Sequence, residues 1–110
     1  MKENKWHLPS KDILNAMYKN NIFINGYYWS SNEDISNSFA WHQDCLTGKK
    51  DYCYKNSNLK VRAVRKLPED HIEIRNVFEW NNTEYQAYHV NAPERMTWEE
   101  AIKYCEELNK

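Results

Sequence analysis

The chain has 110 residues, with 15 basic and 16 acidic side chains and a formal net charge of -1. This balance leaves no positive excess for a nucleic-acid backbone or an anionic membrane surface, so we expect no nucleic-acid partner. No run of residues is long and apolar enough to cross a bilayer, and the amino-terminal residues lack the apolar stretch of a signal peptide, so we expect no membrane insertion. The length suits a single domain over residues 1–110. Its core depends on aromatic side chains, because the mean hydropathy is only -1.00.

Two segments have the pattern of amphipathic helices. The first begins after Ser10, a residue type that favours the N-cap position, and ends near Asn20. The second lies within residues 96–108 and opens with a capping box formed by Thr97 and Glu100. We predict that these two helices pack beside each other. Their apolar faces consist of Ile13, Leu14, Met17 and Tyr18 in the first and of Ala101, Ile102, Cys105 and Leu108 in the second.

Between the helices, short apolar segments alternate with polar turns. The patterns predict strands at residues 27–30, 39–45, 51–54, 59–65, 71–74, 77–80 and 85–90, a polar loop at residues 31–38, and turns at residues 47–49 and 81–82. Within residues 59–65 apolar and basic residues alternate, so Lys60, Arg62 and Arg65 are expected on one solvated face, or in an anion-binding strip. The expected fold class is α+β, with two helices packed on a mostly antiparallel twisted sheet.

Residue types that could carry catalysis or hold a metal do not form a recognised motif. The sequence has no G-x-S-x-G, phosphate loop, C-x-x-C pair or histidine pair at i and i+4. We therefore expect no catalytic residues, no cofactor and no metal site. An alternative for one segment is calcium, because Glu33 and Asp34, with Asn32 and the nearby Asp44, offer oxygen ligands; a solvated loop is the simpler interpretation.

The three cysteines leave one without a partner in any disulfide scheme. Cys45 and Cys53 flank a predicted hairpin turn and in one interpretation face each other. In the other interpretation all three, including Cys105, are reduced and act as small, half-buried apolar residues.

Four segments occur in an order typical of one bacterial family, namely WHLPSKDIL, YYWSSNE, FAWHQDCLTG and VRAVR, over about residues 6–65. They resemble the motifs W-R-L-P-[ST]-x-x-E-L, Y-W-S-S-[ST]-E, A-W-x-x-x-F-x-x-G and V-R-C-V-R of the domain at the C-terminus of Legionella-type collagen-like adhesins. Ala63 stands where this family commonly has a cysteine. The resemblance implies a C-type-lectin-like fold, shared with formylglycine-generating enzymes, and a role in adhesion or recognition.

The order of the segments differs from that of the family, in which a helix like MTWEEAIKYCEEL precedes the W-R-L-P motif. Here that helix ends the chain. The chain therefore resembles a circularly permuted member of the family, which requires that the two ends of the fold lie close together. An alternative is that the helix completes a neighbouring copy, which would make a homo-oligomer by helix exchange.

The function predicted from the sequence is that of a non-enzymatic recognition module for a glycan or a protein, on a cell surface or a phage. Two alternatives stay open: an intracellular interaction or inhibitor protein encoded by a phage or bacterium, and a degenerate enzyme of the formylglycine-generating type. An extracellular or phage-associated location is favoured over a cytoplasmic one. Trp41 is expected to anchor the ligand; the alternative is that this side chain belongs to the core. The predicted ligand-binding residues are Asn32, Glu33, Asp34, Trp41, Tyr54 and Arg62.

Overall fold

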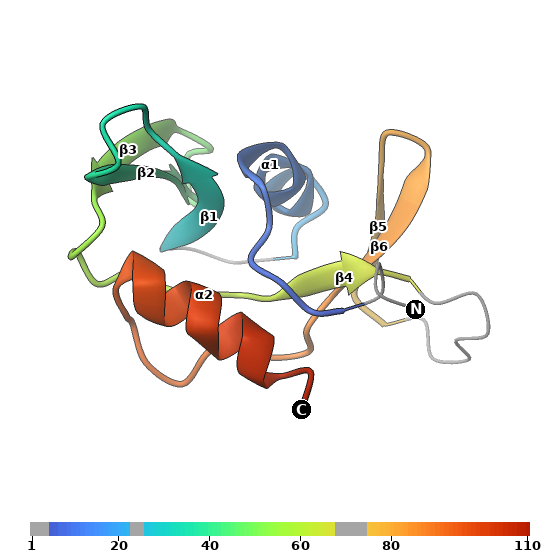
Figure 1. Ribbon diagram of the computed structural model, residues 1–110. Coiled ribbons are helices and arrows are strands. Elements are labelled where there is room, and N and C mark those ends of the chain that lie inside the picture. Colours follow the sequence, from blue (N-terminus) through green and yellow to red (C-terminus); the bar gives the residue numbers. More distant parts are fainter. Residues whose placement is uncertain (1–4, 23–25, 68–74) are drawn as a thin grey trace.

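A computed structural model describes residues 5–22, 26–67 and 75–110 of the chain (Figure 1). Over these residues the protein is a compact α+β fold with two helices and two small antiparallel sheets. The helices are α1 (Lys11–Lys19) and α2 (Trp98–Glu107). The first sheet has the order β1-β2-β3 and the second the order β4-β6-β5. The strands are β1 (Tyr27–Glu33), β2 (Phe39–Asp44), β3 (Lys50–Tyr54), β4 (Val64–Lys66), β5 (Val77–Trp80) and β6 (Thr83–Ala87).

Helix α1 begins and ends where the sequence predicts. The Ser10 hydroxyl accepts a hydrogen bond from the backbone N–H of Ile13 at 3.2 Å, and Asn20 is the C-cap. This cap satisfies one of the N–H groups that have no partner within the helix. The apolar face is buried between the two sheets, where α1 lies in Figure 1. Its buried residues are Ile13, Leu14, Ala16 and Met17.

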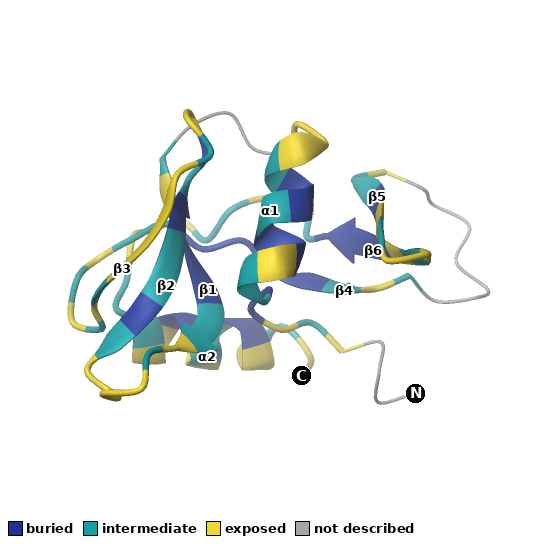
Figure 2. Cartoon of the chain, turned by 90° about the horizontal axis from the view of Figure 1, so that it is seen from above, coloured by how far each residue is buried: buried dark blue, intermediate teal, exposed yellow. Residues whose placement is uncertain are grey.

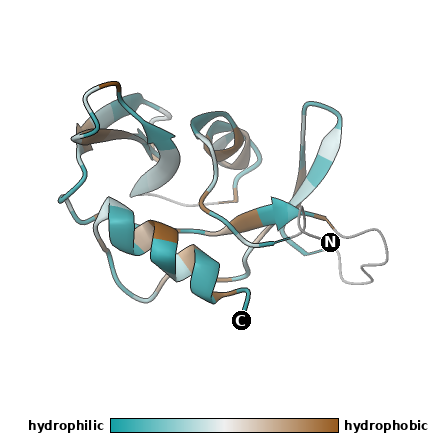
Figure 3. Cartoon of the chain, in the orientation of Figure 1, coloured by the Kyte–Doolittle hydropathy of each residue, from teal (hydrophilic) through white to brown (hydrophobic). Residues whose placement is uncertain are grey.

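The predicted capping box at the start of helix α2 is confirmed. The backbone N–H of Thr97 donates to the Glu100 carboxylate at 3.0 Å, and the backbone N–H of Glu100 lies 3.4 Å from the Thr97 hydroxyl. Ala101 and Cys105 are fully buried, and Leu108 is the C-cap. In Figure 3 the helix is mainly hydrophilic with a narrow apolar band, as expected for a helix that buries one face. Among the described residues, neither helix has the length and apolar character needed to cross a membrane.

The predicted packing of the two helices against each other is wrong. Side chains of a strand alternate between the faces of its sheet, and on β1 the buried Tyr28 joins the core cluster of α1 whereas the buried Trp29 joins that of α2. The helices therefore contact β1 from opposite faces and lie apart in Figure 1. Each amphipathic helix needs one apolar surface, and the two faces of β1 supply one each.

The segment from residue 59 to residue 65 differs most from its prediction. Val61, Arg62, Ala63 and Val64 are consecutive and all buried, and regular strand structure begins only at Val64. The segment passes between the two core clusters, so both of its sides are covered. Alternating burial arises only where one face of a strand meets water, and therefore the expected basic, solvated face is not formed.

The remaining strand predictions need smaller corrections. Strand β1 continues to Glu33, so the predicted loop at residues 31–38 shortens to a turn after that residue. Strand β6 starts and ends earlier than expected, and the predicted strand at residues 71–74 lies outside the described residues. The turn between β5 and β6 is confirmed, because Asn81 and Asn82 both have positive φ angles, of 56° and 63°. Two such residues in a two-residue loop match the twist of a hairpin.

The two ends of the described chain are joined by one side chain. The amide of Asn109, beyond α2, accepts a hydrogen bond from the backbone N–H of Trp6 at 2.7 Å and donates one to the carbonyl oxygen of Trp6 at 2.9 Å. Both polar backbone groups of Trp6 are thereby bonded to a residue that lies 103 positions away. In this fold, segments at opposite ends of the sequence are neighbours in space.

Candidate functional site

Four aromatic side chains form a ladder on one face of the hairpin β2–β3. Phe39 pairs with Tyr54 across the hairpin, and Trp41 pairs with Tyr52. The ring centroids of Phe39 and Tyr54 are 4.5 Å apart and stacked, whereas those of Trp41 and Tyr52 are 4.6 Å apart and edge-to-face. Directly opposed aromatic residues stabilise an antiparallel pair, so the rings hold one another in place. We refer to these four residues as the aromatic ladder.

The ladder is open to solvent over much of its length. Tyr54 is 60% exposed and Tyr52 is 42% exposed, although both are large aromatic residues. Phe39 and Trp41 are half-buried. Figure 2 shows β3 largely in the colour of exposed residues, whereas β1, on the other side of β2, has several buried residues. An exposed, rigid row of aromatic rings is typical of recognition surfaces, because it offers contact area at low entropic cost.

Helix α1 covers one end of the same sheet face and leaves the ladder free. The buried Gln43, two positions beyond Trp41, donates to the side-chain oxygen of Asn15 on the helix at 2.8 Å and to the carbonyl of Gly48 at 3.0 Å. At the start of the helix the ammonium of Lys11 lies 4.5 Å from the ring centroid of Trp41. The amino-terminal end of the helix therefore lies at the edge of the ladder and places a positive charge beside its largest ring.

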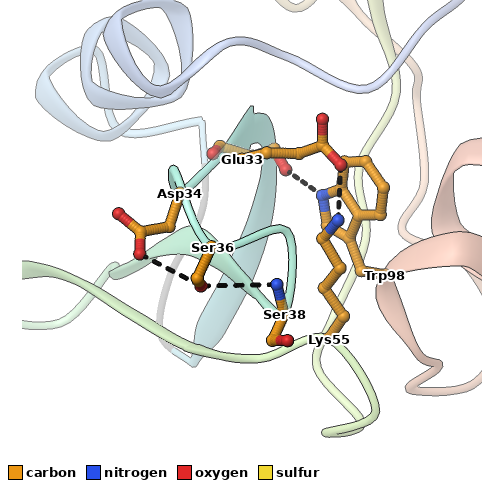
Figure 4. Close-up of polar contacts among 7 residues, drawn as sticks. Glu33, Asp34, Ser36, Ser38, Lys55 and Trp98 are labelled. Atoms are coloured by element: carbon orange, nitrogen blue, oxygen red, sulfur yellow. Dashed lines mark hydrogen bonds and ion pairs between the residues drawn. The ribbon is translucent and has the colours of Figure 1, made fainter.

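The three polar residues predicted as ligands at the end of β1 are already engaged within the protein. The side-chain oxygen of Asn32 accepts the backbone N–H of Lys11 at 2.7 Å. Glu33 forms an ion pair with Lys55, and the Lys55 ammonium lies 4.4 Å from the ring centroid of Trp98 (Figure 4). The Asp34 carboxylate accepts a hydrogen bond from a serine hydroxyl in the same turn, at 3.4 Å. These residues shape the edge of the sheet next to the ladder.

Figure 4 also shows the contacts that cover the Lys55 side chain. Its stem approaches from the end of β3, and the Trp98 indole lies against it from α2. The indole N–H of Trp98 donates to the carbonyl of Ser30 on β1 at 2.9 Å. The side chain of Lys55 is only 15% exposed, and its charge is met by Glu33 on one side and by the aromatic face on the other. This contact connects α2 to the edge of the first sheet.

Arg62 lies inside the molecule and not on a binding surface. It is 9% exposed, and its side chain donates to the carbonyl of Tyr88 at 2.5 Å and to the side-chain oxygen of Asn91 at 3.3 Å. Asn91 in turn donates to the Tyr28 hydroxyl at 2.9 Å. Burial lowers the pKa of the Arg62 guanidinium from its ordinary value. The side chain ties two loop segments to the core instead of meeting a ligand.

Burial favours the uncharged forms of His42, Cys45 and Cys105. Burial lowers the pKa of His42, so its ring favours the neutral form, and its Nδ1 atom is buried without a hydrogen-bond partner among the described residues. Burial raises the pKa of Cys45 and that of Cys105 to about 12, which keeps both thiols protonated and poorly nucleophilic. All three cysteines are free, so Cys45 and Cys53 do not form a disulfide. Cys45 and Cys105 are more buried than the half-buried position expected for them, whereas Cys53 matches it.

Carboxylate, histidine and cysteine side chains do not gather into a metal site in the part of the chain that the structure describes. Within residues 5–22, 26–67 and 75–110, no group of three or more of these side chains is placed to hold a metal ion. Two of the carboxylates considered for calcium have other partners, since Glu33 is paired with a lysine and the Asp44 carboxylate accepts hydrogen bonds within its turn.

Of the six predicted ligand residues, the structure brings two, Trp41 and Tyr54, into one surface. It adds Phe39 and Tyr52, which the sequence reasoning did not choose as site residues. A pattern for them was present: aromatic residues two positions apart on each arm of a predicted hairpin must share a face, and the intervening turn sets them opposite each other.

No family model, no curated protein and no solved structure matches the chain.

Proposed function

We propose that the chain is a non-enzymatic recognition module that binds a glycan or a protein through the aromatic ladder. The observation that carries this proposal is the solvent exposure of Tyr52 and Tyr54 in a row of four packed rings. Large aromatic side chains favour burial, so a contiguous exposed set on a sheet indicates a surface that is covered in a complex. Aromatic faces stack on the apolar faces of sugar rings and also anchor protein interfaces.

We further propose that the fold is C-type-lectin-like and related, by circular permutation, to the adhesin domains that the sequence motifs resemble. The paired hydrogen bonds between Trp6 and Asn109 support the permutation, because a fold with adjacent ends can be opened elsewhere without loss of contacts. Helix α2, the displaced element, packs on β1, as the permutation requires.

The test compares three variants of exposed or half-exposed residues in one binding assay. The labelled protein is applied to an array of bacterial and host glycans and to a displayed peptide library, and any ligand found is titrated against Tyr54→Ala, Trp41→Ala and the control Val90→Ala. Val90 is an exposed apolar residue outside the ladder. We expect Tyr54→Ala to weaken binding about tenfold or more with only a small fall in melting temperature, because an anchoring aromatic contributes about 2 kcal/mol to binding, whereas a cross-strand pair contributes about 0.2–1 kcal/mol to stability.

Trp41→Ala is expected to weaken binding and to lower the melting temperature, since its ring is half-buried against Tyr52 and Lys11. Val90→Ala is expected to change neither quantity. If a ligand is found and Tyr54→Ala binds it as tightly as the original protein, the aromatic ladder is not the site and the proposal fails.

A further inference from the structure

A second candidate site is a hollow of about 420 Å³ where the start of β1 meets two later segments of the chain. Because side chains alternate along a strand, Tyr27 and its partner Asp44 point to the face opposite Tyr28 and Gln43, and therefore away from the aromatic ladder. The volume lies within the range of small-molecule sites in proteins. The hollow is therefore separate from the surface proposed above.

Backbone hydrogen bonds hold the walls of the hollow in place. The N–H of Lys60 donates to the carbonyl of Tyr27 at 2.9 Å, and the N–H of Cys45 donates to the carbonyl of Gly26 at 2.8 Å. Leu59 and Met96 exchange two hydrogen bonds, of 3.0 and 2.9 Å, which fixes the residue before Met96 beside the hollow. Because each wall is bonded to the next, a ligand meets a site that is already formed, and binding requires little ordering of the chain.

Glycine at position 26 makes room for a charged side chain. Its φ angle is +111°, and a Cβ atom there would lie 2.8 Å from Cδ and 2.9 Å from Nζ of Lys60. The Lys60 side chain thus lies across the glycine, with its ammonium 5.9 Å from the ring centroid of Tyr28. A residue with a side chain at position 26 would clash with the Lys60 side chain and move it.

Among the described residues, the lining combines two cations, one carboxylate and an apolar wall. Lys60 and Arg95 supply the positive charges, and Arg95 is exposed, with no hydrogen bond or ion pair to another described residue. The Asp44 carboxylate also lines the hollow, but it accepts hydrogen bonds from the N–H of Leu46 at 3.0 Å and from a threonine hydroxyl at 3.1 Å. Tyr27 is 52% exposed and Leu46 is 69% exposed, so the wall is open to a ligand.

This lining suits a ligand with a single negative charge, several hydroxyl groups and one apolar face. The two cations and one carboxylate among the described lining residues sum to one positive charge, which favours a monoanion over a dianion or a neutral molecule. Asp44 keeps free lone pairs that can accept from a hydroxyl group. We propose that the hollow binds an acidic sugar residue, with its carboxylate between Lys60 and Arg95 and its ring against Tyr27. This site goes beyond the proposed function and does not depend on the aromatic ladder.

The experiment titrates the folded protein with methyl β-D-glucuronide and, as the matched neutral probe, with methyl β-D-glucoside, and follows both by NMR. We expect the glucuronide to bind with a dissociation constant of about 1 mM. The glucoside should bind at least about tenfold more weakly than the glucuronide. Arg95→Gln and Lys60→Met should each weaken binding of the glucuronide about tenfold. Lys103→Gln, which removes an exposed positive charge on α2, should leave the affinity for the glucuronide unchanged.

The proposal is overturned if the glucuronide does not bind at about 10 mM, if the two probes bind equally, or if Arg95→Gln keeps the original affinity. Because Arg95 is exposed and unbonded to other described residues, this variant is expected to keep its melting temperature, which is measured in parallel. Tyr54→Ala should bind the glucuronide normally. That result separates this site from the ladder, so either proposal can fail while the other stands.

Discussion

The bond between the two chain ends allows a quantitative test of the fold through Asn109→Ala. The substitution removes both hydrogen bonds to the polar backbone groups of Trp6, together with a longer one, of 3.5 Å, to the carbonyl of Cys105. Each such bond contributes about 0.5–1.5 kcal/mol, and water can replace the lost partners at this exposed site, so we expect a loss of about 1–2 kcal/mol. For a domain of this size that corresponds to a fall of about 4–16 °C in melting temperature.

The substitution should also weaken the packing of the Trp6 side chain. Its ring lies edge-to-face on Tyr88, with centroids 4.9 Å apart, and the guanidinium of Arg65 lies 4.3 Å from its centroid. Without the Asn109 amide, the backbone of Trp6 is less restrained and these contacts weaken. Urea unfolding followed by tryptophan fluorescence measures the free energy, and the midpoint should shift without a change in slope.

A second substitution tests the direction of each bond. Asn109→Asp keeps an acceptor for the Trp6 N–H but loses the donor to the Trp6 carbonyl, and it places a negative charge near the C-terminus of α2, where the helix dipole disfavours it. We expect it to be at least as destabilising as Asn109→Ala. Lys110→Ala is the control, because its exposed ion pair with Glu107 should contribute less than about 0.5 kcal/mol. An Asn109→Ala or Asn109→Asp protein as stable as the original would refute this account of the chain ends.

Three further predictions concern the cysteines and one glycine. In native protein a thiol reagent should modify Cys53 first, and the buried Cys45 and Cys105 only after denaturant is added; equal rates for all three would contradict the burial described here. Burial raises the pKa of Cys105 from 9.0 to about 12, so this thiol ionises at lower pH in the unfolded chain than in the folded protein. The free energy of unfolding should therefore fall as the pH rises from about 9 toward 12. Over that range the urea midpoint of Cys105→Ala should fall less steeply than that of the original protein. Gly48→Ala should destabilise the fold by about 1–3 kcal/mol in thermal unfolding, because the φ angle is +84° and the new Cβ would lie 2.8 Å from the Tyr18 ring; an unchanged melt would show that the turn rearranges without cost.

Interactions between residues close in the sequence were predictable. The Ser10 cap, the Thr97–Glu100 capping box and the Asn81–Asn82 turn each depend on a side chain or backbone preference that acts over two or three residues. The same holds for the hairpin β2–β3, whose strands and turn appear in the predicted order. Its alternating aromatic residues also contained the aromatic ladder, although the prediction selected only Trp41 and Tyr54 from it.

The sequence by itself therefore determined the α+β class, the helix ends, the turns and the hairpin, because local preferences act before distant segments meet. Only the tertiary structure decided which faces are covered. Arg62 belongs to an alternating segment and is nevertheless buried, because packing covers both sides of that segment. Lys60 and Arg95 are far apart in the sequence and line one hollow, because the paired hydrogen bonds between Leu59 and Met96 bring their segments together. Such placements depend on long-range contacts, which leave no periodic pattern in the chain.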